Sequence, residues 1–142
     1  MNWEKLSDAE ILEALPGVNG NFQLLCSFLA LLPVAATVKD PLGRMIYANR
    51  VALKLYGRKP GEMVGQTIDK IIEIADPKVP REIRRTEKKV LTDNRAGIFF
   101  QQLGTERRPI RHSVLKFPFF DSDGDSILVS IVFPTNPKQL EK

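Results

Sequence analysis

Apolar residues recur every three to four positions over residues 6–32, a spacing that predicts two amphipathic helices. Ser7 or Asp8 can cap the first helix, and the second runs into Pro33. The apolar stripe of the second helix is wider than contact with one small sheet requires, so we predict that a second copy of the chain covers the remainder. The residues expected in this dimer interface are Ile11, Leu15, Phe22, Leu25, Phe28, Leu29 and Leu32.

From Val34 onward the pattern changes to short runs typical of strands and turns. Two strands flank a turn at residues 40–43, where Gly43 is expected to adopt positive φ. Asn49 is predicted to cap a short helix that ends at Gly57, and a longer helix follows near Pro80. Three strands then close the chain before Pro134. Because strands and helices are segregated along the sequence, the order predicts an α+β fold with an antiparallel sheet and helices on one side.

Seven of these residues stand in the order and spacing of a known family pattern: Asp40, Gly43, Ile46, Tyr47, Asn49, Gly57 and Gly65. In these positions the chain resembles a PAS domain, and the resemblance extends over residues 32–134. It implies the PAS fold, a five-stranded antiparallel sheet of order 2-1-5-4-3, with helices on one face and an extra N-terminal helical segment. It also implies a hollow between sheet and helices that often holds a small molecule. We therefore divide the chain into dimerisation helices (1–32), a PAS domain (33–134) and a polar tail or linker (135–142).

Composition narrows the classes of function. The 142 residues are 43% hydrophobic and 27% charged, which suits one folded domain. The net charge of +4 is spread along the chain, and its densest basic run, 78–89, is interpreted as solvated surface, so direct nucleic-acid binding is not expected. The apolar run 24–38 is too short and interrupted to cross a membrane, and the N-terminus lacks the basic start of a secretory signal. These features predict a cytoplasmic protein.

The residues that usually carry catalysis are scarce. The chain has one cysteine, Cys26, and one histidine, His112, too few for a metal site of its own ligands or for most nucleophilic sites. Flavin-binding PAS relatives carry a reactive cysteine where this chain has residues 67–75, which contain none. Haem-binding relatives place a histidine on the long helix, and residues 80–95 contain none. We therefore expect a non-enzyme and see neither a haem nor a flavin motif, so the cofactor stays unknown.

A ligand pocket can be predicted from side-chain alternation. On the fourth strand Lys116 is expected to face water, which would turn Ser113, Leu115 and Phe117 inward. The alternative is ordinary core packing with no ligand. The full set of residues predicted to line the pocket is Val38, Ile46, Leu55, Ile68, Ile72, Val90, Phe99, Ser113, Leu115, Phe117, Val129 and Ile131.

Two functions remain open on the sequence. The first is a sensory and dimerising module that binds a small molecule or partner protein and biases an output domain, either a transcription regulator or a histidine kinase. The second is a ligand-free scaffold for protein–protein interaction, which would use the sheet face or the N-terminal helices. A small molecule that co-purifies with the chain supports sensing, whereas a colourless, ligand-free dimer supports the scaffold.

Overall fold

The computed structural model describes Lys5 and residues 21–72, 76–105, 108–121 and 124–134. The helices in these ranges are α2 (Phe22–Ala30), α3 (Arg50–Tyr56), α4 (Pro60–Met63), α5 (Ile68–Ile71) and α6 (Lys78–Asp93). The strands are β1 (Ala36–Lys39), β2 (Met45–Ala48), β3 (Gly97–Thr105), β4 (Arg108–Phe120) and β5 (Ser126–Pro134). The predicted first helix, with Ile11 and Leu15, and the predicted tail from residue 135 lie outside the described residues.

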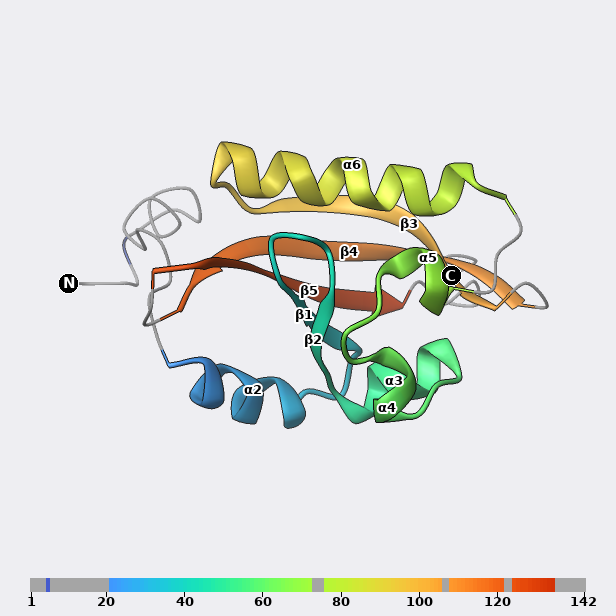
Figure 1. The fold of residues 1–142 in the computed structure, drawn as a ribbon, viewed down its shortest axis with the longest axis horizontal. Coiled ribbons are helices and arrows are strands. Elements are labelled where there is room, and N and C mark those ends of the chain that lie inside the picture. The colour runs from blue at the N-terminus through green and yellow to red at the C-terminus, as the bar shows by residue number, and fades with distance from the viewer. Residues whose placement is uncertain (1–4, 6–20, 73–75, 106–107, 122–123, 135–142) are drawn as a thin grey trace.

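The five strands form one antiparallel sheet in the order β2-β1-β5-β4-β3, as predicted (Figure 1). β3 and β4 pair from Gly97 opposite Lys116 to Thr105 opposite Arg108. β5 then joins the long hairpin to β1, with Val38 opposite Val129. The last strand of the chain therefore lies in the middle of the sheet, which makes the fold depend on contacts between distant parts of the sequence.

Turn and cap residues act as the sequence predicts. Gly43 has φ of +82°, a conformation that a residue with a Cβ rarely adopts. The carboxylate of Asp40 accepts hydrogen bonds from the backbone N–H groups of Leu42 and Arg44, which holds the β1–β2 turn in shape. Gly57 ends α3 in the left-handed conformation.

Asn49 has a larger role than the predicted helix cap. Its side-chain oxygen accepts hydrogen bonds from the backbone N–H groups of Ala52, in α3, and Ala36, in β1, at 2.9 and 3.1 Å. Its side-chain nitrogen donates to the carbonyls of Leu29 and Val34, both at 2.9 Å. One buried amide therefore joins α2, β1 and α3 through hydrogen bonds to four backbone groups at this junction.

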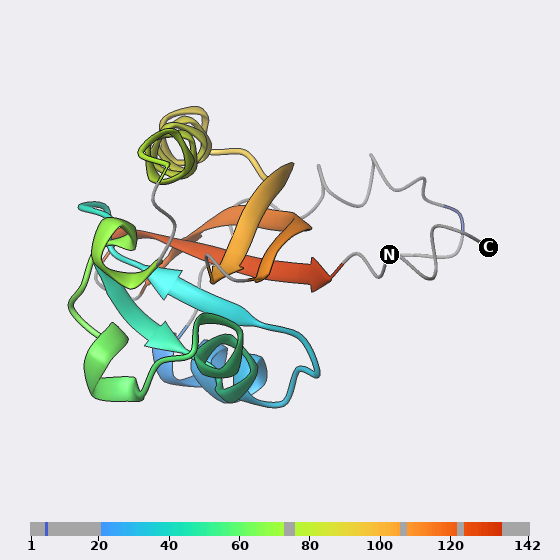
Figure 2. The same cartoon turned by 90° about the vertical axis from the view of Figure 1, so that its right-hand side faces the viewer.

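Helices cover both faces of the sheet. α6 lies on one side of the strands and α2 on the other, as both views show (Figures 1 and 2). We call the face under α6 the inner face and the face under α2 the outer face. The inner core contains apolar residues of α3, α4, α5 and α6, among them Tyr56, Met63, Ile71 and Ile83. The outer core is smaller and is centred on Leu29 of α2.

The structure changes the role predicted for α2. Its residues Phe22, Leu25 and Leu29, with Leu32 just beyond its end, pack against the sheet of their own chain instead of being left over for a second copy. The sequence pattern could not show this because it does not reveal which apolar stripe the sheet itself covers. The residues that α2 turns to solvent are Leu24, Phe28 and Leu31. Of the predicted interface residues in the described ranges, Phe28 is the one that stays exposed.

Candidate functional site

The inner face of the sheet carries a buried network of polar side chains. Three charged residues form its centre: Lys39 in β1, Glu87 in α6 and Lys116 in β4, which are 3%, 7% and 1% exposed. Glu87 lies on the buried stripe of α6, which the helical spacing places against the sheet. Residues so deeply buried almost always have partners when they carry charge. We call this set, with Thr86 and Gln101, the inner polar network.

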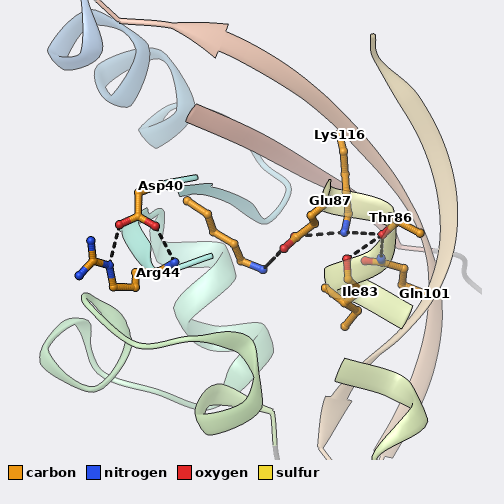
Figure 3. A network of polar contacts seen from close by, with 8 residues as sticks. Asp40, Arg44, Ile83, Thr86, Glu87, Gln101 and Lys116 are labelled. Atoms are coloured by element: carbon orange, nitrogen blue, oxygen red, sulfur yellow. Dashed lines mark hydrogen bonds and ion pairs between the residues drawn. The ribbon is translucent and has the colours of Figure 1, made fainter. Parts of the chain in front are cut away.

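Each member of the network contacts the next at hydrogen-bond distance. The ammonium of Lys39 donates to both carboxylate oxygens of Glu87, at 2.8 and 3.0 Å. Lys116 donates to Glu87 at 3.1 Å and to the hydroxyl of Thr86 at 3.3 Å, and Gln101 donates to the same hydroxyl at 3.1 Å (Figure 3). Thr86 in turn donates to the carbonyl of Ile83. The network thus fastens α6 to three strands through one carboxylate and one hydroxyl.

Burial and charge oppose each other in this network. Burial lowers the pKa of Lys116 to about 8, although the neighbouring Glu87 carboxylate favours its charged form. Burial alone would raise the pKa of Glu87, but the two ammonium groups outweigh it and the pKa lies below the ordinary value. Burial, followed by the charge of Glu87, raises the pKa of Tyr56, so its phenol is neutral. The ring of Phe99 lies 5.9 Å from the Lys116 nitrogen and adds a cation–π contact.

A small cavity lies between this network and the inner core. Its volume is about 10 Å³, room for about one water molecule. The hydroxyl of Ser130, in β5, lines the cavity and has no hydrogen-bond partner among the described residues. The hollow implied by the resemblance is therefore almost filled in this structure, and Lys39, Glu87 and Lys116 are among the residues that line what remains.

The predicted phase of the fourth strand is wrong. Lys116 faces the inner core, with Val114 beside it on the same face, so Ser113, Leu115 and Phe117 face the other way. The alternation is ambiguous because β4 carries apolar residues on both faces, and a lysine is expected to face water unless a buried partner is in view. A buried carboxylate on the opposing helix is what reverses that assignment.

The predicted pocket residues therefore divide between the two faces. On the inner side, Leu55, Ile68 and Ile72 join the main core, Val90 is buried on α6, and Phe99 lies beside Lys116. The other predicted residues do not line an inner pocket. Those that pack in the outer core, under α2, are Val38, Ile46, Phe117, Val129 and Ile131.

The two residues with the most reactive side chains do not meet. Cys26 is on α2, on the outer side, and burial raises the pKa of its thiol. His112 is buried on the inner side of β4, in phase with Val114. The sheet lies between them, which excludes a Cys–His pair in this structure. Neither ring nitrogen of His112 has a hydrogen-bond partner among the described residues, and burial lowers its pKa.

The outer face carries a second feature that the sequence did not single out. Phe100 lies opposite Ser113, which lies opposite Phe133, and the neighbouring row contains Ile98, Leu115 and Ile131. Ile98, Phe100 and Phe133 are 69%, 71% and 46% exposed, and we call these three residues the sheet patch. Solvent-exposed aromatic residues grouped on one surface typically mark a contact site.

A family profile described as the PAS fold matches residues 29–134, three-quarters of the chain. The chain belongs to the PAS-fold family. The family places it among the sensor modules of signalling proteins, in agreement with the resemblance found in the sequence. No curated protein sequence matches the chain significantly.

Solved PAS structures share this fold at low sequence identity. The PAS domain of BvgS from Bordetella pertussis is 19% identical with a TM-score of 0.68, and the match covers 84% of this chain and 90% of that one. VqmA bound to DPO is 19% identical with a TM-score of 0.63, and coverage is 82% and 58%. A Vibrio cholerae VqmA dimer is 18% identical with a TM-score of 0.63, and coverage is 84% and 54%. The chain therefore matches little more than half of VqmA.

Among the described helices, none is both long enough and apolar enough to span a bilayer.

Proposed function

We propose that this chain is a sensory and dimerising module that relays a signal through its sheet and catalyses no reaction of its own. Membership of the PAS-fold family supports the signalling role. A Vibrio cholerae VqmA dimer of similar fold changes conformation in the absence of its target DNA, which supports a transcription regulator as the output. A histidine kinase is the alternative output.

The sheet patch is the observation that carries the dimer. α2 packs with residues of β1, β2 and β5 and with the distal part of β4, but no residue of β3 belongs to the outer core. The remaining part of the outer face exposes Ile98, Phe100 and Phe133. A second copy that places its own patch on this surface would cover the same residues on both chains, as a two-fold interface requires. Phe28, exposed on α2, is the predicted interface residue that can extend this contact.

The dimer is tested by charging the patch. Phe100→Glu should weaken association by about tenfold or more, because a carboxylate buried in an apolar interface loses its hydration without a partner. Sedimentation velocity over a concentration series measures the monomer–dimer equilibrium, and circular dichroism verifies that each variant is folded.

Val64→Glu is the matched control. Val64 is also an exposed apolar residue, but it lies just after α4 and outside the sheet patch. Its replacement should leave association unchanged. A wild-type chain that stays monomeric at the highest concentration, or a Phe100→Glu variant that associates like wild type, contradicts the proposed dimer.

Small-molecule sensing is a second candidate, favoured by the hydroxyl of Ser130 at the inner cavity, which lacks a hydrogen-bond partner in the part of the chain that the structure describes. Because that cavity has room for about one water molecule, a larger ligand must first displace Lys116 or Glu87. Mass spectrometry of the purified chain under denaturing conditions tests this candidate. A bound small molecule supports it, and a ligand-free dimer favours the protein-interaction scaffold.

A further inference from the structure

A cleft opens on the molecular surface between the β1–β2 turn and α6. Its volume is about 440 Å³, which is large enough for a small organic molecule. One wall is the turn, residues 40–43, and the other is the C-terminal half of α6. Lys39 and Glu87 also line it, so this cleft reaches the inner polar network from outside. We call it the hairpin cleft.

The hairpin cleft has an apolar wall. Leu42 projects from the turn and is largely exposed, although it is a large aliphatic residue. Pro41 lies next to it, and Leu91 and Leu128 line the cleft as well. An apolar group bound here would remove these side chains from water, which is the usual source of affinity in small-molecule sites.

The charges around the cleft favour an anion. Its lining includes three cations and two carboxylates: Lys39, Arg84, Lys88, Asp40 and Glu87. Both carboxylates are engaged, since Asp40 pairs with Arg44 and Glu87 with two buried lysines. Arg84 pairs with Asp69.

Lys88 is the cation that remains available at the rim. It is exposed, and it has no ion pair with any residue that the structure describes. A ligand carboxylate beside Lys88 would therefore gain a partner without breaking an existing ion pair.

We propose that the hairpin cleft binds a small organic monocarboxylate, with its carboxylate at Lys88 and its apolar body against Leu42, Leu91 and Leu128. The bound molecule would bridge the β1–β2 turn and α6 beside Lys39 and Glu87 of the inner polar network. It would therefore favour the arrangement in which α6 is held against the sheet. This site shares no residue with the sheet patch. The proposed ligand site and the proposed dimer can therefore be tested separately.

The test uses hexanoate as the probe and hexanamide as its uncharged counterpart, with ionic strength held constant. Two-dimensional ¹H–¹⁵N NMR spectra follow the backbone amides during each titration. Hexanoate should give saturable shifts at residues 40–43 and 88–92, with a dissociation constant on the order of millimolar for so small a ligand. Hexanamide should bind several-fold more weakly because it lacks the charge.

Charge reversal at Lys88 has a close control on the same helix. Lys88→Glu should weaken hexanoate binding by about threefold to tenfold, the range for losing a surface ion pair and adding a like charge. Lys89→Glu makes the same change at an exposed lysine that does not line the cleft, and should leave binding unchanged. Leu42→Ser should weaken hexanoate and hexanamide alike.

Several results would overturn the proposal: shifts that do not saturate, shifts away from the cleft, equal binding of hexanoate and hexanamide, or equal effects of Lys88→Glu and Lys89→Glu. The spectra themselves report whether each variant is folded, so a misfolded variant cannot be mistaken for a loss of binding.

Discussion

The two faces of the sheet distribute charged and apolar residues in opposite ways. The inner face buries Lys39, Glu87 and Lys116 beneath α6, whereas the outer face exposes Ile98, Phe100 and Phe133. In most domains charges lie outside and aromatic residues inside. The inner face is closed by the chain's own helices, so its charges must compensate one another. The outer face is only partly covered by α2, so its apolar residues remain available to another molecule.

This difference separates two tasks within one small sheet. The inner polar network joins α6 to β1 and β4 through contacts that depend on charge and position. The sheet patch offers a contact that depends mainly on shape and apolar area. Asn49, which hydrogen bonds to both α2 and α3, connects the two layers.

Glu87→Gln is expected to give the largest effect, because it removes the one carboxylate that compensates two buried ammonium groups. Breaking a buried ion pair on one side typically costs roughly 3–5 kcal/mol, and the free energy of unfolding should fall by about that amount. Urea unfolding followed by circular dichroism measures the change. If Glu87→Gln unfolds at the wild-type urea concentration, the inner charges are not coupled as described.

Lys116→Met is the comparison variant for this experiment. It removes one of the two cations, leaves the neutral Lys39–Glu87 pair in place, and fills a similar volume with an apolar chain. Because burial already disfavours the Lys116 ammonium, stability should change by less than about 1.5 kcal/mol in either direction. A loss as large as that of Glu87→Gln would show that the network needs both lysines.

Asn49→Ala tests the connection between the two layers. It should give the next largest loss in the free energy of unfolding. It leaves two N–H groups and two carbonyls of the backbone without their present partner, so we expect a loss of roughly 2–4 kcal/mol. Asn21→Ala is the matched control, since Asn21 caps α2 at an exposed site, and it should cost about 0.5–1 kcal/mol. Thermal unfolding compares the two. If Asn49→Ala and Asn21→Ala lose equal stability, Asn49 does not connect the two layers.

The sequence was sufficient for the architecture of this domain. Glycines at turns, the Asp40 turn and the Asn49 cap are local signals, because each reflects a conformation of a few adjacent residues, and the structure confirms them. Strand order followed from the family resemblance. Glu87 shares the buried stripe of its helix with Ile83 and Val90, a position that helical spacing alone would indicate. A carboxylate on a buried stripe is the signal in the sequence that a cation must lie opposite it on the sheet.

The candidate site depends on long-range contacts that no local pattern encodes. Glu87 is 48 positions from Lys39 and 29 positions from Lys116, and neither lysine alone differs from a surface residue in the sequence. The phase predicted for β4 is wrong because both of its faces carry apolar side chains, and the partner that turns Lys116 inward, Glu87, lies on a distant helix. The exposure of Phe100 likewise follows from where α2 ends its contact with the sheet.

The smallest expected effect concerns His112, a buried residue of the inner face whose two ring nitrogens have no hydrogen-bond partner among the described residues. Burial holds its pKa below the ordinary value, so the unfolded chain binds a proton more readily than the folded one. The stabilisation from keeping His112 neutral is therefore complete above about pH 6.5 and is lost as the pH falls below that value. Since the chain has one histidine, no other side chain normally titrates near pH 6.

Urea unfolding at pH 7 and at pH 5.5 should consequently show lower stability at pH 5.5, by no more than about 1.4 kcal/mol per pH unit for one proton. In His112→Leu this fall should be much smaller, because the substituted side chain does not titrate. The same fall in wild type and variant would assign the proton uptake to other groups.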